Sequence, residues 1–420
     1  MNKVLIITYY WPPGSGAGVQ RWLKFSKYLP LFGWEPVILT IDPEYAAYPV
    51  LDNSLLTELS DNLTVYKTRA TDYFRLYKRD KTKIPSAGFA GNQDKSLKGK
   101  LFRFIRGNFF IPDPRKGWNK FAFKKACSII ESEGIKHIIT TSPPHSTQLI
   151  GLRLKKKYPA IKWISDLRDP WTDIYYYDLF YPTFISRKID RNYEKSVLLN
   201  ADIVITVGYS LGKQLESKVR GISSKIKIIH NGYDESDFEN IDPIASHRFI
   251  ISYTGTISES YPLDGFVKAL NRLIADENDI LFRFTGLIAE SQKKQIESSI
   301  AMDRLEFIRY ADHRDAIIQM VSSSLLLLVI ARHPGNRSFL SGKLFEYIAS
   351  GRPVLCLGPV DGDAAQILNS TGCGRCFSYD DENGIAGFIL STLDQHAEPR
   401  KTRPVEFSRR YLTEQIASLL

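Results

Sequence analysis

The sequence has few cysteines and no long apolar segment. These two features argue against a disulfide-rich protein and against a protein that spans a membrane. Four cysteines among 420 residues agree with a reducing compartment, where disulfides are rare. No run of about 20 apolar residues occurs, so no segment is predicted to span a membrane. The start of the chain, Met1–Thr8, enters a strand pattern and lacks the long hydrophobic stretch and cleavage site of a signal peptide. We therefore expect a cytoplasmic protein, long enough for two domains of about 200 residues each.

Metal-binding and nucleic-acid-binding motifs are also missing. Cys373 and Cys376 have zinc or redox spacing, but no second Cys/His pair follows, so we expect no metal. The net charge of +10 is concentrated between Arg75 and Lys116, where twelve basic and three acidic residues give +9. No familiar nucleic-acid motif accompanies this charge, and we expect no nucleic-acid partner.

Within the basic segment, Leu97–Ile111 interleaves aromatic and aliphatic residues with cations and contains no acid. Such a segment can place its apolar residues at a bilayer surface while its cations face anionic lipid. We therefore predict a membrane-docking role for residues 75–118. The alternative is that the apolar residues pack on the domain and the cations are solvated.

Short apolar runs alternate with amphipathic helical patterns along both halves of the chain. This alternation predicts an α/β protein with two parallel sheets. The expected strands are Lys3–Thr8, Glu35–Ile41, Ile135–Thr141, Lys162–Ser165, Ala201–Val207, Phe249–Tyr253, Leu281–Phe284, Leu305–Ile308, Leu325–Ile330 and Val354–Leu357. The expected helices include Val19–Leu29, Phe121–Glu133, Thr147–Lys157, Leu211–Lys218 and Phe407–Leu420. Residues 44–118 are poorly periodic and are predicted to form an insertion.

A polar loop and a short helix follow the apolar run Leu325–Ile330, at the strand end where open α/β sheets bind ligands. Ser341 can cap this helix, and Lys343 lies in its first turn, where the helix dipole favours negative charge. A bound phosphate would compensate the lysine. Glu346 and Tyr347 share its face, so the pattern indicates a ligand with a diphosphate and hydroxyl groups. The alternative is a surface Lys343–Glu346 pair.

Two further loops open at strand ends in the first half. The loop 12–18 spaces its glycines at 14, 16 and 18, which is not the dinucleotide-binding pattern; a tight turn with positive φ is the alternative to a ligand role. His145 lies between a strand end and a helix start, where binding a ligand and capping the helix are both open.

The strand predicted over Lys162–Ser165 ends in Asp166-Leu-Arg-Asp-Pro-Trp171. Two carboxylates, a guanidinium and an indole at one strand end can orient a sugar, because carboxylates hold hydroxyl groups and an aromatic face stacks on C–H groups. The alternative is a loop that Asp–Arg pairs hold in place. We interpret Asp166 and Asp169 as residues that bind a sugar.

The segment Lys343-Leu-Phe-Glu-Tyr-Ile-Ala-Ser-Gly-Arg-Pro-Val354 resembles the nucleotide-sugar signature of glycosyltransferase family 4, retaining enzymes of the GT-B fold. Glu346 matches the second glutamate of the family's Glu-x7-Glu motif, which binds the nucleotide ribose. Ser338 occupies the position of the first glutamate, which contacts the donor sugar. His230-Asn-Gly-Tyr-Asp234 is similar to the Asn-Gly-Val-Asp that the family carries at the crossing between domains.

The resemblance implies two Rossmann-like parallel-sheet domains that face each other across a cleft. Residues 1–235 would form the acceptor-binding domain, with a basic and aromatic insertion at about 68–118. Residues 236–400 would form the nucleotide-sugar-binding domain, and the terminal helix in 401–420 would pack back on the first domain.

The resemblance and the strand-end positions together give a set of expected site residues. The catalytic candidates are Asp166, Asp169, His145 and Lys343. The donor-binding candidates are Gly16, Gly18, Gly255, Thr256, Gly286, Arg337, Ser338, Lys343, Leu344 and Glu346. The family usually holds the diphosphate with an Arg and a Lys after the Gly255 strand; neither is present, so Lys343 would act alone or with Arg332 or Arg337.

We therefore expect a retaining hexosyl- or N-acetylhexosaminyl-type glycosyltransferase that needs neither metal nor cofactor. Its partners would be a UDP- or GDP-sugar donor and a glycan or lipid-linked acceptor, in bacterial surface polysaccharide or lipopolysaccharide biosynthesis. It would be cytoplasmic and peripheral on the inner face of the cell membrane. Two alternatives remain: a nucleotide-sugar epimerase on the same fold, and a non-catalytic protein that binds nucleotide sugars or glycans.

Overall fold

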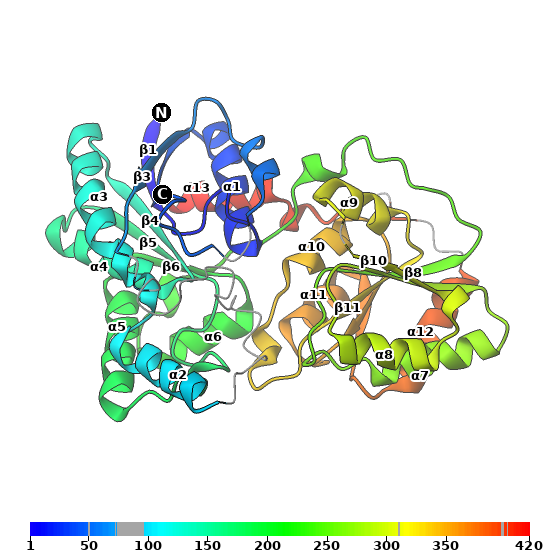
Figure 1. Ribbon diagram of the computed structural model, residues 1–420. Coiled ribbons are helices and arrows are strands. Elements are labelled where there is room, and N and C mark those ends of the chain that lie inside the picture. The colour runs from blue at the N-terminus through cyan, green and yellow to red at the C-terminus, as the bar shows by residue number, and fades with distance from the viewer. Residues whose placement is uncertain (49–50, 72, 74–95, 310, 396–398, 401) are drawn as a thin grey trace. The chain divides into compact units, whose positions relative to one another are not determined.

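The computed structural model describes residues 1–48, 51–71, 73, 96–309, 311–395, 399–400 and 402–420. The chain divides into two compact units, residues 1–230 with 409–420 and residues 231–408. Each unit is a parallel sheet with helices packed on both faces (Figure 1). The predicted fold class of two parallel α/β sheets is confirmed. Much of the predicted insertion, residues 74–95, lies outside the described residues.

The first unit holds a seven-stranded sheet of order β3-β2-β1-β4-β5-β6-β7. Its strands are β1 (Asn2–Ile7), β2 (Trp34–Ile41), β3 (Thr64–Thr68), β4 (His137–Ser142), β5 (Lys162–Leu167), β6 (Ile203–Thr206) and β7 (Ile226–Ile228). Its α-helices are α1 (Ala17–Tyr28), α2 (Leu97–Phe109), α3 (Asn119–Glu133), α4 (Gln148–Lys157), α5 (Phe184–Asn200), α6 (Tyr209–Lys218) and the terminal α13 (Arg409–Leu419).

Two cores lie on opposite faces of this sheet, because successive strand residues point to opposite sides. On β1, Val4 and Ile6 pack with α1 and α13, whereas Leu5 and Ile7 pack with the core that contains α3 to α6. Both sets are buried, which explains why these strands are continuous apolar runs in the sequence.

The second unit repeats the arrangement with a six-stranded sheet of order β10-β9-β8-β11-β12-β13. Its strands are β8 (Phe249–Thr254), β9 (Ile280–Thr285), β10 (Leu305–Ile308), β11 (Leu325–Val329), β12 (Val354–Leu357) and β13 (Gly374–Phe377). Its α-helices are α7 (Asp264–Ala275), α8 (Glu290–Ser299), α9 (His313–Val321), α10 (Gly342–Ala349), α11 (Asp363–Thr371) and α12 (Glu382–Asp394). One core lies between the sheet and α7, α8 and α12, and the other between the sheet and α9, α10 and α11.

Three elements differ from the sequence-based expectation for physical reasons. The edge strand β3 is only half-buried, so it lacks the continuous apolar run that marks the central strands. The buried face of α5 includes Ser186, Asp190 and Glu194, which hide its helical hydrophobic period. β5 continues to Leu167, so Asp166 lies inside the strand rather than after it. None of the helices within the described ranges is long and apolar enough to cross a bilayer.

The packing of α4 on β5 gives a stability prediction. A Cβ atom at Gly151 would lie 2.4 Å from the ring of Trp163. That ring cannot easily move, because its Nε1 donates a hydrogen bond to Thr140 Oγ1 at 2.8 Å in the core. We expect Gly151→Ala to lower the free energy of unfolding by about 1 to 3 kcal/mol.

Urea denaturation followed by tryptophan fluorescence checks this, because all six tryptophans lie in the first unit. The control is Lys156→Ala on the same helix of the first unit, because the side chain of Lys156 is exposed. It should not destabilise the protein, since alanine is the better helix former. Equal midpoints for Gly151→Ala and the wild type would contradict this packing.

Candidate functional site

Each sheet reverses its strand order beside its first strand, between β1 and β4 in the first unit and between β8 and β11 in the second. Open parallel sheets bind ligands beyond the carboxyl ends of the strands at this switch point. The loops there carry several of the predicted residues. Gly16 and Gly18 follow β1, His145 follows β4, Gly255 follows β8, and Lys343 begins the helix after β11.

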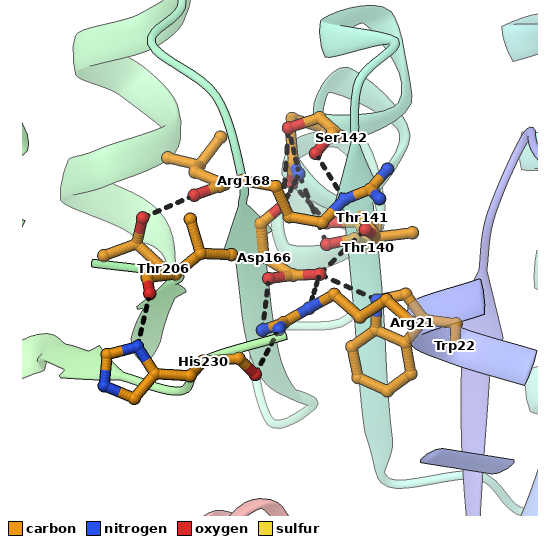
Figure 2. Close-up of polar contacts among 12 residues, drawn as sticks. Arg21, Trp22, Thr140, Thr141, Ser142, Asp166, Arg168, Thr206 and His230 are labelled. Atoms are coloured by element: carbon orange, nitrogen blue, oxygen red, sulfur yellow. Dashed lines mark hydrogen bonds and ion pairs between the residues drawn. The ribbon is translucent and has the colours of Figure 1, made fainter. Parts of the chain in front are cut away.

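A buried ion pair and its hydrogen bonds join four segments of the first unit (Figure 2). Arg21 on α1 donates from Nε and Nη2 to the two oxygens of Asp166 on β5, at 3.1 Å each. Trp22 Nε1 and Thr141 Oγ1 donate to Asp166 Oδ2 at 2.7 and 2.8 Å. Arg21 Nη1 donates to the His230 carbonyl at 2.8 Å, so the guanidinium also holds the chain after β7.

This geometry corrects the predicted role of Asp166. Its side chain is 0% exposed, and four hydrogen bonds from within the protein occupy its two oxygens. Burial lowers the pKa of Arg21, and the Asp166 carboxylate opposes that effect. Asp166 is therefore a positioning residue and does not present its carboxylate to an acceptor.

Arg168 and Asp169 lie beyond the end of β5 and differ from Asp166 in their surroundings. Figure 2 shows Arg168 beside Ser142, and its Nε and Nη2 donate to the carbonyls of Ser142 and Pro143 at 3.0 and 3.3 Å. The half-buried Asp169 forms no hydrogen bond or ion pair with the residues that the structure describes. Burial raises the pKa of Asp169, and Arg168 opposes that rise. Asp169 therefore remains a candidate residue for binding a hydroxyl group.

His145 is half-buried at the start of the turn before α4, and its ring stacks on Trp171 with centroids 4.9 Å apart. Burial lowers the pKa of His145 to about 4, so the ring is neutral at neutral pH. Its Nδ1 is buried and has no hydrogen-bond partner among the described residues. The side chain does not cap α4, which removes that alternative.

The glycines of the first loop have different roles. Gly16 precedes α1 with a φ of 99°, a conformation that favours glycine. Gly18 has no such requirement, and a Cβ there would lie 3.5 Å from both Arg168 Nη2 and the Tyr10 ring. The tight-turn interpretation therefore holds at Gly16, while Gly18 lies where the backbone passes Arg168.

In the second unit, two glycine loops approach each other at the carboxyl ends of β8 and β9. Gly255 and Gly286 both have positive φ, 115° and 132°. A Cβ at Gly286 would lie 2.0 Å from the carbonyl oxygen of Gly255, and one at Gly255 would lie 2.6 Å from Lys343 Nζ. Only glycine fits at these two positions.

Lys343 points from the first turn of α10 towards these loops. Its Nζ donates to Tyr253 Oη at 2.8 Å and lies 4.4 Å from the centre of that ring. Tyr253 Oη in turn donates to the carbonyl of Thr256 at 2.8 Å. Burial lowers the pKa of Lys343, and Tyr347, Tyr261 and Glu346 oppose this. The structure thus brings Lys343, Gly255 and Thr256 together, with the half-buried Glu346 one turn along α10.

The remaining predicted donor residues are placed differently. Leu344 is fully buried in the core and its backbone nitrogen bonds to Ser341, so its assignment to the donor site is corrected. Arg337 pairs with Asp361 at 3.0 Å on the surface. The Ser338 hydroxyl donates to the carbonyl of Gly335 at 3.0 Å.

Sequence analysis missed Tyr253, Arg21 and Trp22. The signals in the sequence were a tyrosine inside an apolar strand and an arginine next to a tryptophan in the predicted helix Val19–Leu29. Within the described residues, no group of three or more His, Cys, Asp or Glu side chains is placed to hold a metal ion. Independence from metal stays a prediction.

No protein-family model matches the sequence, and no curated protein matches it. Solved structures are similar over nearly the whole chain. Sucrose-phosphate synthase from Thermosynechococcus elongatus has a TM-score of 0.61 at 14% identity, covering 100% of this chain and 95% of its own. HepE from Anabaena in complex with UDP has a TM-score of 0.58 at 12% identity, covering 99% and 95%.

A putative UDP-N-acetylglucosamine 2-epimerase from Listeria monocytogenes is also similar, with a TM-score of 0.55 at 11% identity over 99% of this chain and 94% of its own. At these identities the likeness establishes the fold. The chain has the GT-B fold, as the resemblance implied.

The ion pair of Asp166 and Arg21 gives a second stability prediction. Asp166→Asn should lower the free energy of unfolding by about 3 to 5 kcal/mol, because it leaves a buried guanidinium without its counter-charge. The matched control is Asp178→Asn, whose side chain is 76% exposed and pairs with Arg187. It should cost no more than about 1 kcal/mol. Urea denaturation measures both, and similar losses in the two variants would refute the structural role of Asp166.

Proposed function

We propose that the protein is a retaining glycosyltransferase that moves a hexose or N-acetylhexosamine from a UDP- or GDP-sugar to a glycan or lipid-linked acceptor. The proposed setting is bacterial surface polysaccharide or lipopolysaccharide biosynthesis. The observation that carries the proposal is the Lys343 ammonium against the Gly255 loop, at the switch point of the second sheet. The GT-B fold and its similarity to HepE, solved with UDP, support it.

The second unit would bind the donor. Lys343 and the backbone of the close-packed Gly255 and Gly286 loops would contact the diphosphate, since these positions lack side chains that would keep a ligand away. Glu346 would bind the ribose, as the resemblance implies. The leaving group is a nucleotide diphosphate, so a fixed cation stabilises the charge that develops on it. The sugar would be attacked on the face from which the nucleotide departs, with retention.

The first unit would bind the acceptor. Asp169 offers a carboxylate without an internal partner among the described residues, and His145 offers a neutral ring with a buried nitrogen. Gly18 lets the backbone pass beside Arg168 at the same end of the sheet. These features suit hydroxyl groups of a sugar acceptor.

A nucleotide-sugar epimerase is the second candidate, favoured by the similarity to the putative Listeria 2-epimerase. It would use the same donor residues and would need no separate acceptor. A non-catalytic binding protein is the third candidate, and Ser338 in place of the family's first glutamate favours it.

We also propose that the protein docks on an anionic membrane through α2 and the start of α5. Asn108 on α2 joins the two elements, since its Nδ2 donates to the Tyr181 carbonyl at 3.0 Å and its Oδ1 accepts from Thr183 N at 2.7 Å. Exposed apolar side chains lie on both elements, and we call them the apolar patch: Leu97, Leu101, Phe102, Phe104, Phe109, Tyr181, Phe184, Ile185 and Ile189. The exposed Lys98, Lys100 and Lys188 flank it and suit anionic lipid.

Nucleotide binding tests the donor site. UDP or GDP should stabilise the wild type against heat, by about 2.7 kcal/mol at 100 times the dissociation constant. Lys343→Ala should weaken that binding at least tenfold, because the diphosphate loses its cation. The control is Lys294→Ala, whose side chain is 72% exposed on α8, and it should bind normally.

Calorimetric titration gives the three affinities, and repeating it with EDTA tests independence from metal. An unchanged affinity in a folded Lys343→Ala variant would refute the donor site. Loss of nucleotide binding in EDTA, restored by magnesium, would refute metal independence.

Flotation with vesicles tests membrane docking. The wild type should bind vesicles that contain anionic phosphatidylglycerol, less so at high salt, and should not bind neutral vesicles. The double variant Phe184→Ser, Ile185→Ser should lose this binding, because both side chains are more than two-thirds exposed, at 79% and 68%. The control Leu287→Ser, Met302→Ser changes two exposed apolar residues of the second unit and should float like the wild type. Identical flotation of both variants would refute the assignment of the apolar patch.

A further inference from the structure

Three arginines from separate segments lie at the carboxyl end of the first sheet: Arg106 on α2, Arg115 in the turn before α3, and Arg168 after β5. Tyr10 and Gly18 connect two of them. Arg168 Nη2 lies 3.5 Å from the position of a Cβ on Gly18, and the Tyr10 ring lies 3.5 Å from the same position. The guanidinium carbon of Arg115 lies 6.0 Å from the centre of the Tyr10 ring.

Arg106 extends this cluster towards α5. Its guanidinium lies 4.0 Å over the ring of Phe180, so one side is covered by an apolar face. Burial, followed by the charge of Arg115, lowers the pKa of Arg106 to about 10, which leaves the side chain protonated at neutral pH. Arg106 forms no hydrogen bond or ion pair with the residues that the structure describes.

Two carboxylates of the described residues lie near the cluster. The oxygens of Asp113 accept from Arg115 N, Ser146 N and Ser146 Oγ at 2.9, 2.8 and 2.9 Å. Asp169 follows Arg168 in the chain, and the Arg168 charge acts on its carboxyl group. Neither carboxylate pairs with Arg106. A half-buried cation without a counter-ion is costly unless a ligand supplies the charge.

We propose that Arg106, Arg115 and Arg168 form a phosphate-binding subsite, and that the acceptor carries a phosphate or diphosphate group. Guanidinium groups bind phosphate oxygens with two parallel hydrogen bonds, which favours arginine at such a site. The subsite adjoins Gly18 and Asp169, where the acceptor is placed by the proposed function, on which this inference rests. It adds the chemical class of the acceptor, which is anionic.

Calorimetric titration with inorganic pyrophosphate tests the subsite. The protein is first saturated with UDP, so that the donor site of the second unit cannot take up the probe. The wild type should bind pyrophosphate with saturation, and Arg106→Gln should bind it at least tenfold more weakly, which corresponds to about 1.4 kcal/mol. Lys156→Gln, which changes an exposed cation on α4, is the control and should bind like the wild type.

Arg106→Lys is the second variant, because it keeps the charge and tests the subsite if Arg106→Gln does not fold. It should show weaker pyrophosphate binding than the wild type, since lysine cannot form the two parallel bonds. UDP affinity should be the same in every variant. Absence of saturable pyrophosphate binding by the wild type, or equal affinities in wild type and Arg106→Gln, would overturn the proposal.

The titrations distinguish failure of the proposed function from failure of the phosphate subsite. If neither UDP nor GDP binds the wild type, the donor site is refuted, and pyrophosphate is titrated without a nucleotide. A loss in Arg106→Gln would then still establish the subsite, now without a nucleotide-sugar function. Equal affinities would refute both.

The same titration separates two sources of the phosphate group. Farnesyl diphosphate carries an isoprenoid chain, and α2 presents the exposed Phe102 and Phe109 beside Arg106 in the sequence. Farnesyl diphosphate binding tenfold tighter than pyrophosphate, with the gain lost in Phe102→Ser, identifies a lipid diphosphate. Equal binding of the two probes identifies a soluble phosphorylated glycan. Both results support the subsite, provided that Arg106→Gln weakens the binding of both probes.

Discussion

The buried pair of Asp166 and Arg21 is the interaction on which the first unit depends. Both side chains are at most 1% exposed, and either charge alone in the core would be strongly unfavourable. The pair therefore fixes α1 against β5, while Thr141 adds β4 and the His230 carbonyl adds the chain after β7. Because α1 starts directly after Gly16 and β5 ends directly before Arg168, this pair sets how the candidate acceptor residues lie.

In the second unit, other contacts hold the loops at the switch point. There the glycine loops after β8 and β9 touch through their backbones, and Lys343 closes against Tyr253. In both units, helices cover the two faces of the parallel sheet. Polar groups that bind a ligand are therefore expected beyond the carboxyl ends of the strands, at the switch point. The same edge of each sheet therefore carries the candidate residues, Asp169 with the arginine cluster in the first unit and Lys343 in the second.

Strands that are buried on both faces of a sheet could be predicted from the sequence. Elements and site residues outside such strands were harder to predict. Strands such as β1, β2 and β11 were predicted because continuous apolar runs mark them. The function of Asp166 was not, because a strand longer by only two residues turns a strand-end carboxylate into a core residue. Nor could the arginine cluster be found, because Arg115 and Arg168 belong to segments far apart in the chain that only the tertiary fold brings to Tyr10 and Gly18. Lys343 was identified because the first turn of a helix favours negative charge, so a cation there is unexpected.

The proposed activity is the transfer of a sugar from a nucleotide to an anionic acceptor. Its most direct test is the release of nucleotide diphosphate from a panel of UDP- and GDP-sugars, with and without lipid-linked and phosphorylated glycan acceptors. The account predicts release from one donor only when an acceptor is present, and a product that retains the anomeric configuration. Conversion of the sugar to its epimer without any acceptor, or no turnover of any donor that binds, would contradict it.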